Sequence, residues 1–114
     1  GVLIIVADKS MKIGGGRGEA IRANIVRLML GEGVRPPNRR KNISIPSYQK
    51  GDIVAFSDLV DLLEDIGDNA SNLDITDRTI RDAVRGINER AEEPKNFGKF
   101  IFKISENESS FRLI

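Results

Sequence analysis

The chain contains no cysteine and no histidine among its 114 residues. Without cysteine it cannot form a disulfide framework or use a thiol nucleophile, which fits a reducing compartment. Without histidine it also lacks zinc sites of the usual nitrogen and sulfur type and every Ser-His or Cys-His catalytic arrangement. Most hydrolytic chemistry is thereby excluded. The sequence therefore predicts a protein that is not an enzyme and that holds no metal and no cofactor.

Long hydrophobic runs are also missing. The longest apolar stretch, Val2 to Ala7, is far too short to span a bilayer, and no positively charged segment precedes it as a secretory signal would require. We therefore expect a cytoplasmic protein with no membrane partner. The length suits one domain over residues 1–114, and because the chain begins at Gly1 without a methionine, a fragment of a longer protein is also open.

The formal net charge is only +1, but the charges of each sign gather in different segments. Segment 56–68 carries five acids and no base, whereas segment 33–41 carries four bases and no acid (Arg35, Arg39, Arg40 and Lys41). This separation predicts one acidic and one basic surface. A basic surface is the usual electrostatic footprint of a nucleic-acid binder.

Hydrophobic periodicity and turn residues predict the first half of the fold. Two short strands over 2–6 and 11–13 are followed by a glycine-rich turn and by a first helix over 19–30. Residues 32–47 hold three prolines together with the basic cluster, so we expect an extended loop there. The loop either tracks phosphates or only increases solubility, and the sequence does not decide between these roles.

The second half predicts two helices and a hairpin. Ser57 is placed to cap a second helix that ends at Gly67, and Thr76 is placed to cap a third helix that Pro94 stops. In the third helix one narrow stripe is apolar (Ile80, Ala83, Val84, Ile87 and Ala91). At the end of the chain, alternation predicts two strands, with Phe100, Phe102 and Ile104 on one face of the first and Phe111 and Leu113 on one face of the second. A helix-turn-helix followed by a hairpin is typical of a winged helix, an α+β fold.

The third helix carries the sharpest functional signal. At about 100° per residue, Arg78, Arg81, Arg85 and Asn88 fall on one stripe away from the apolar face. Such a stripe suits a helix in the major groove, because arginine pairs with guanine edges and phosphates and asparagine can pair with adenine. The alternative is an ordinary solvated helix, since nearby acids reduce its net charge. The hairpin, which carries Lys99, Lys103 and Arg112, favours DNA.

Three segments resemble the DNA-binding effector domain of response regulators of the OmpR/PhoB type. Arg78-Thr79-Ile80, followed by Val84, Ile87 and Arg90, is similar to that family's recognition-helix pattern. Phe111-Arg112-Leu113 is similar to the end of its wing, and residues 51–59 are similar to the apolar lead into its second helix. The resemblance implies a transcription regulator with the third helix in the major groove, the wing at the adjacent minor groove, and the loop over residues 67–74 available to RNA polymerase. The resemblance also leaves open whether two copies of the chain bind DNA as a homodimer.

The chain departs from that family in three places. The loop after the first helix is longer, Gly86 stands where a larger residue is usual, and the wing tip Glu106-Asn107-Glu108 is acidic. Because phosphates repel an acidic tip, we expect the wing to contact DNA through its strands or hardly at all.

Two other features have simpler explanations. Residues 14–18 are glycine-rich and precede a helix, but they lack the Lys-Ser/Thr pair of a nucleotide-binding loop. The carboxylates of the second helix follow an amphipathic period, which is typical of a solvated face rather than of a metal cluster. The sequence thus predicts a winged-helix domain that binds double-stranded DNA in a sequence-specific way, through Arg78, Thr79, Arg81, Arg85, Asn88, Arg39, Arg40, Lys41, Lys99, Lys103 and Arg112. The alternative is a winged helix that binds another protein and not DNA.

Overall fold

The computed structural model describes residues 2–6, 8–14, 20–30, 48–66 and 75–114. Within these ranges the chain forms a small α+β domain with three helices and two antiparallel sheets, which confirms the predicted class. The elements in chain order are β1 (Val2–Val6), β2 (Lys9–Ile13), α1 (Ala20–Met29), β3 (Val54–Ala55), α2 (Phe56–Ile66), α3 (Asp77–Glu92), β4 (Phe102–Ile104) and β5 (Ser110–Leu113).

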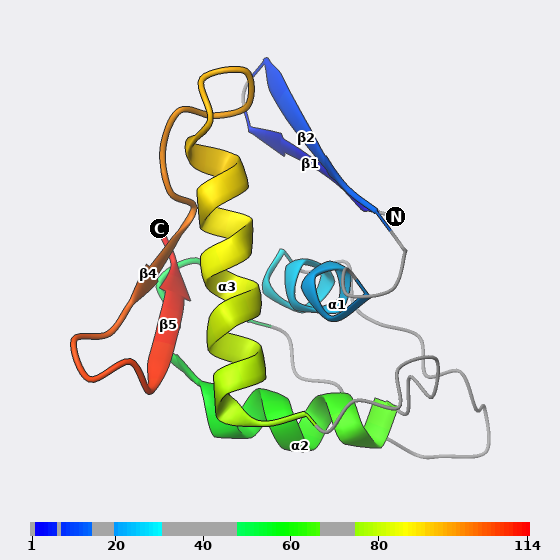
Figure 1. The fold of residues 1–114 in the computed structure, drawn as a ribbon, viewed down its shortest axis with the longest axis vertical. Coiled ribbons are helices and arrows are strands. Elements are labelled where there is room, and N and C mark those ends of the chain that lie inside the picture. The colour runs from blue at the N-terminus through cyan, green and yellow to red at the C-terminus, as the bar shows by residue number, and fades with distance from the viewer. Residues whose placement is uncertain (1, 7, 15–19, 31–47, 67–74) are drawn as a thin grey trace.

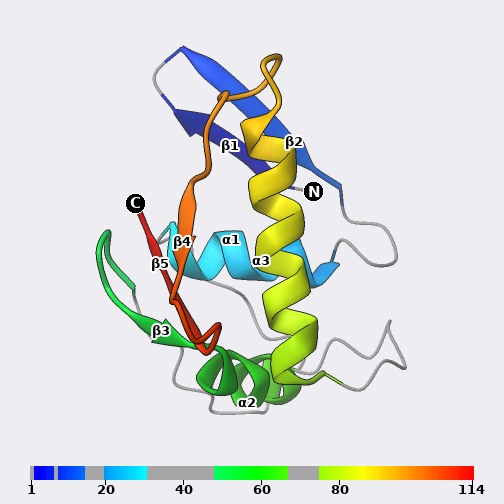
Figure 2. The same cartoon turned by 60° about the vertical axis from the view of Figure 1, so that its left-hand side comes forward.

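Helix α3 is the axis around which the other elements are arranged (Figure 1). Helix α2 crosses beneath the first turn of α3, α1 lies on one side of it, and the β4–β5 hairpin lies on the other side (Figures 1 and 2). Strands β1 and β2 lie beside the C-terminal half of α3, where the Arg90 side chain donates a hydrogen bond to the carbonyl oxygen of Lys12 at 3.3 Å. One long side of α3 is therefore left toward solvent, between α1 and the hairpin.

The first two strands pair with each other and cover one end of the core. Val2 lies opposite Ile13 and Ile4 lies opposite Met11, and all four side chains are buried. The alternate positions of β1, Leu3 and Ile5, are exposed. The hairpin over residues 2–13 was predicted, although β2 begins at Lys9 rather than at residue 11. Alternation places every second side chain on the same face of a strand, so one face of this pair joins the core.

The second sheet has the strand order β3-β5-β4. Three phenylalanines hold this sheet to the helices. The rings of Phe56 and Phe111 stack with their centroids 5.5 Å apart, and Phe102 meets Phe111 edge to face at 5.4 Å. All three side chains are buried. Full burial of a phenylalanine side chain stabilises a fold by about 1.5–3 kcal/mol, so these few aromatic residues tie the C-terminal hairpin to the start of α2.

The predicted start of α2 is wrong by two residues. The helix begins at Phe56 and not after Ser57, because β3 leads into it without a loop. The backbone N–H of Phe56 donates to the carbonyl oxygen of Ser109 in the neighbouring hairpin at 3.0 Å. At other helix starts a capping side chain accepts from such a backbone N–H group. Here the carbonyl oxygen of Ser109 accepts instead.

The apolar stripe of α3 is buried as predicted, and the helix ends at Glu92, before Pro94. The hairpin also forms, but its first strand is shorter than expected. Phe100 was predicted to face the core with Phe102; instead it is exposed, and the adjacent Ile101 is buried. The regular alternation of the strand starts only at Phe102, because the backbone just before it bonds to a side chain of α3.

Candidate nucleic-acid interface

The start of α3 is fixed by a reciprocal pair of threonines. The hydroxyl of Thr76 accepts a hydrogen bond from the backbone N–H of Thr79 at 3.3 Å, and the hydroxyl of Thr79 accepts one from the backbone N–H of Thr76 at 3.1 Å. This capping box satisfies backbone donors that the helix itself leaves unpaired. It confirms the cap predicted at Thr76. Thr79 is a predicted DNA contact, and its hydroxyl is engaged in this cap. Arg78 lies between the two threonines, in the first turn that the cap holds.

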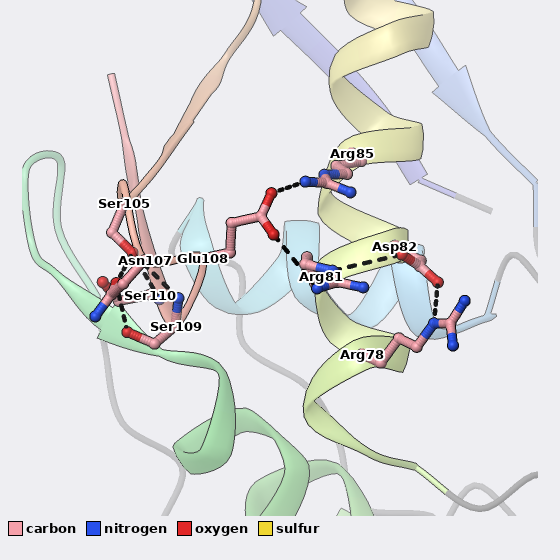
Figure 3. A network of polar contacts seen from close by, with 9 residues as sticks. All are labelled: Arg78, Arg81, Asp82, Arg85, Ser105, Asn107, Glu108, Ser109 and Ser110. Carbon is pink, nitrogen blue, oxygen red and sulfur yellow. Dashed lines mark hydrogen bonds and ion pairs between the residues drawn. The ribbon is translucent and has the colours of Figure 1, made fainter.

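The three arginines of the stripe differ in their exposure. The side chain of Arg78 is 80% exposed, that of Arg85 is 44% exposed and that of Arg81 only 27%. Arg81 lies deepest because it stands next to the hairpin (Figure 3). Arg78 is therefore the side chain best able to reach outward from α3.

Each of these arginines has a carboxylate beside it (Figure 3). Asp82 lies 3.8 Å from Nε of Arg78 and 3.7 Å from Nε of Arg81. Glu108, at the tip of the hairpin, forms ion pairs with both Arg81, at 3.4 Å, and Arg85. The solvent side of α3 is consequently a network of alternating charges rather than a purely basic ridge. Exposed ion pairs of this kind contribute only about 0–1 kcal/mol each, so an incoming phosphate can replace such a carboxylate.

Asn88 was predicted to contact DNA from the exposed stripe, and its predicted exposure is wrong. Its side chain is only 4% exposed and faces the hairpin. The amide nitrogen donates to the carbonyl oxygen of Phe102 at 3.0 Å, and the amide oxygen accepts from the backbone N–H groups of Ile101 and Phe102 at 3.2 and 3.0 Å. Asn88 lies at the boundary between the apolar and polar faces of the helix. Its amide forms hydrogen bonds with the buried backbone of Ile101 and Phe102 there. Periodicity alone does not distinguish the two outcomes.

The basic residues of the hairpin fall into two places. Lys103 and Arg112 lie directly opposite each other on β4 and β5, and both side chains are exposed. Together with Ile53 they line one hollow, whereas Lys99 lines another, next to Lys50 and Phe100. Among the residues that the structure describes, neither Lys103 nor Arg112 has a carboxylate partner. Like charges directly across an antiparallel pair are destabilising, and the acidic side chain of Glu106 lines the same hollow as these two cations.

Arg22 lies beside Arg78 at another groove, although it was not among the predicted DNA contacts. It projects from α1 onto α3, where its guanidinium lies against Gly86, in the place that a Cβ atom there would occupy. The same side chain lines a groove of about 320 Å³ with Thr76, Arg78 and Asp82. Within the described ranges Arg22 has no carboxylate partner. The signal in the sequence was Gly86, an unusual residue inside a helix.

The acidic residues of α2 that the structure describes, Asp58, Asp61 and Glu64, are exposed, as expected of a solvated face. Asp58 acts on Tyr48: burial of the phenol, and secondly the negative charge of Asp58, raise the pKa of Tyr48. In the described part of the chain, no three acidic side chains come together as metal ligands would, and no helix there could cross a membrane.

Several predicted features lie outside the described residues. They are the basic loop with Arg39, Arg40 and Lys41, the glycine-rich turn after Gly14, and the segment 67–74 to which the resemblance assigned contact with RNA polymerase. Comparisons of the chain with models of known families, with curated proteins and with solved structures found no match. The fold and the site thus define a small α+β domain with an arginine-bearing helix exposed beside a hairpin, and the resemblance to response-regulator effector domains stays a prediction.

Proposed function

We propose that this chain is a winged-helix domain that binds double-stranded DNA, with α3 in the major groove, as the output domain of a transcription regulator. The order helix, strand, helix, helix and hairpin supports the winged-helix assignment, as does the strand order β3-β5-β4, which returns the last strand between the other two. In this reading β4 and β5 form the wing.

One observation carries the DNA-binding proposal. The arginines of α3 and the tip of the β4–β5 hairpin form one continuous surface, since Glu108 contacts both Arg81 and Arg85. A helix about 10–12 Å in diameter fits the major groove, which is about 12 Å wide, and a hairpin beside it then lies near the DNA backbone. Arg78 near the start of α3 and Arg22 on α1 line one groove, from which phosphates or base edges could be reached once Arg78 leaves its partner Asp82.

Selection from a pool of random-sequence duplexes tests this proposal. We expect recovery of a preferred sequence, and Arg78→Ala should weaken binding to it about 5- to 150-fold, because a base-contacting arginine contributes about 1–3 kcal/mol. Lys95→Ala is the matched control. Lys95 is 79% exposed, as Arg78 is 80% exposed, and each has one carboxylate partner, but Lys95 lies beyond the last turn of α3. Equal affinity losses in the two variants, or no enriched sequence, would contradict the proposal.

A second candidate function is a protein-interaction domain. It is favoured by the carboxylates that pair with every arginine of the stripe and by the exposed acids on α2. This candidate predicts that no duplex is enriched. It also predicts that charge reversal on α2, for example Asp61→Lys, and not on α3, abolishes capture of a partner.

A further inference from the structure

Glu108 adopts a backbone conformation that is unusual for its residue type. Its φ is 55°, and no other non-glycine residue in the described ranges has a positive φ. Its N–H donates to the carbonyl oxygen of Ser105 at 2.9 Å, which closes the hairpin turn. Hairpin turns of this kind favour glycine or asparagine at the left-handed position, because a Cβ atom is strained there. A glutamate at this position therefore indicates that its side chain has a role.

The rest of the turn is held by its own polar groups. The hydroxyl of Ser105 accepts from the backbone N–H groups of Ser109 and Ser110 at 3.2 and 3.1 Å. The side-chain oxygen of Asn107 accepts from the hydroxyls of Ser105 and Ser109, each at 2.8 Å. All these hydrogen bonds join residues within the turn. Of the turn residues drawn, only Glu108 extends its side chain from the tip to α3 (Figure 3). The turn uses the backbone N–H of Glu108 but does not need its side chain for its own hydrogen bonds.

The carboxylate of Glu108 is shared between two guanidinium groups. One oxygen, Oε2, lies 3.4 Å from Nη1 of Arg81, and the other, Oε1, pairs with Nη2 of Arg85. The two arginines stand one helical turn apart. Moreover, Nε of Arg81 is buried without a hydrogen-bond partner, so the donors of this pair are not fully satisfied. Such an arrangement suits an anion that offers several oxygens, and a phosphodiester offers two non-bridging oxygens with a full negative charge.

We propose that Arg81 and Arg85 form a site for a backbone phosphate of nucleic acid, and that Glu108 occupies this site in the free protein and leaves it when the phosphate binds. This inference rests on the proposed function. It assigns Arg81 and Arg85 to phosphate contact and leaves Arg78, the most exposed arginine of the stripe, to reach the bases. It also explains the acidic wing tip, which in the free protein faces two arginines instead of a phosphate.

Affinity for a labelled duplex, measured for Glu108→Gln and for Glu106→Gln, tests the proposal. Both variants remove one negative charge from the same turn, but Glu106 lines the hollow of Lys103 and Arg112 and forms no ion pair with any described residue. Glu108→Gln should bind about fivefold more tightly than Glu106→Gln, which corresponds to ~1 kcal/mol, the upper range for an exposed ion pair. Glu108→Gly should not lower the melting temperature, because glycine relieves the left-handed strain. Equal or weaker binding by Glu108→Gln, compared with Glu106→Gln, would overturn the proposal.

A second readout separates this site from the DNA-binding function. Inorganic phosphate is titrated into each variant while the Nε–Hε signals of Arg81 and Arg85 are followed by NMR. The proposal predicts that these signals shift at lower phosphate concentration in Glu108→Gln than in Glu106→Gln. If they do so although no duplex binds to any variant, the anion site stands and the proposed function fails. If phosphate moves neither signal in Glu108→Gln, the site itself is refuted.

Discussion

The side-chain amide of Asn88 on α3 bonds to both the N–H and the carbonyl group of Phe102 on β4. The amide thus makes the two hydrogen bonds to Phe102 that the backbone of a neighbouring strand would otherwise make. This contact stabilises the hairpin against α3, to which the packing of Phe102 and Phe111 also holds it. A residue that the sequence pattern assigned to DNA contact instead holds the two halves of the proposed interface together.

Replacement of Asn88 should therefore change stability rather than recognition. Asn88→Ala leaves three buried backbone groups without partners, so the free energy of unfolding should fall by about 2–4 kcal/mol in urea titrations. Asn107→Ala, in the exposed turn, is the control and should change it by less than about 1 kcal/mol. Under conditions in which both variants are folded, duplex affinity should match that of the parent. A selective loss of DNA binding without loss of stability would contradict this role.

For the cross-strand pair of Lys103 and Arg112 we expect the opposite result, a gain in stability together with weaker binding. Lys103→Glu places unlike charges directly opposite each other, which should stabilise the hairpin by about 0.2–1 kcal/mol. If the wing contacts DNA as proposed, the same change should weaken duplex binding about fivefold or more, because it removes a cation and adds an anion. Thermal unfolding measures the expected gain in stability, and duplex titration measures the expected loss of affinity. Lys95→Glu, beyond the last turn of α3, should leave the affinity unchanged.

The sequence predicted those parts of the fold in which periodicity and turn chemistry act locally. The apolar stripe of α3, its cap at Thr76 and the pairing of β1 with β2 follow from such short-range patterns. The roles of Asn88 and Glu108 depend on contacts between α3 and the hairpin segment, which lies 13 or more residues away along the chain. No spacing rule within one helix predicts such contacts, and the start of α2 at Phe56 escaped prediction for the same reason.

Gly86 offers a test of how Arg22 packs on α3. Gly86→Ala should raise the free energy of unfolding by about 0.5–1 kcal/mol, because alanine is the better helix former and the flexible end of Arg22 can move aside. In an Arg22→Ala background the gain should be at least as large. If Gly86→Ala destabilises the parent but stabilises the Arg22→Ala variant, Arg22 is held rigidly and this expectation is wrong.

Tyr48 is the only tyrosine and the chain has no tryptophan, so its phenolate absorbance can be followed without overlap. Burial and the charge of Asp58 raise its pKa above the ordinary value of 10.0. The neutral phenol is therefore favoured in the folded state, and this stabilisation is present below pH 10 and lost as the pH rises through the raised pKa. Asp58→Asn should lower the pKa but leave it above the ordinary value, since burial is the larger cause. A midpoint at the ordinary value in the parent protein would contradict this packing.

The salt dependence of duplex affinity tests the DNA-binding proposal most directly. Cations from α1, α3 and the wing that neutralise phosphates must release counterions on binding. With about four to seven phosphate contacts, the logarithm of the association constant should fall against the logarithm of the salt concentration with a slope of about −4 to −6. Arg22→Ala should make the slope less steep by about one contact, whereas Lys95→Ala should leave it unchanged. A slope indistinguishable from zero, or no measurable duplex binding at low salt, would contradict the account.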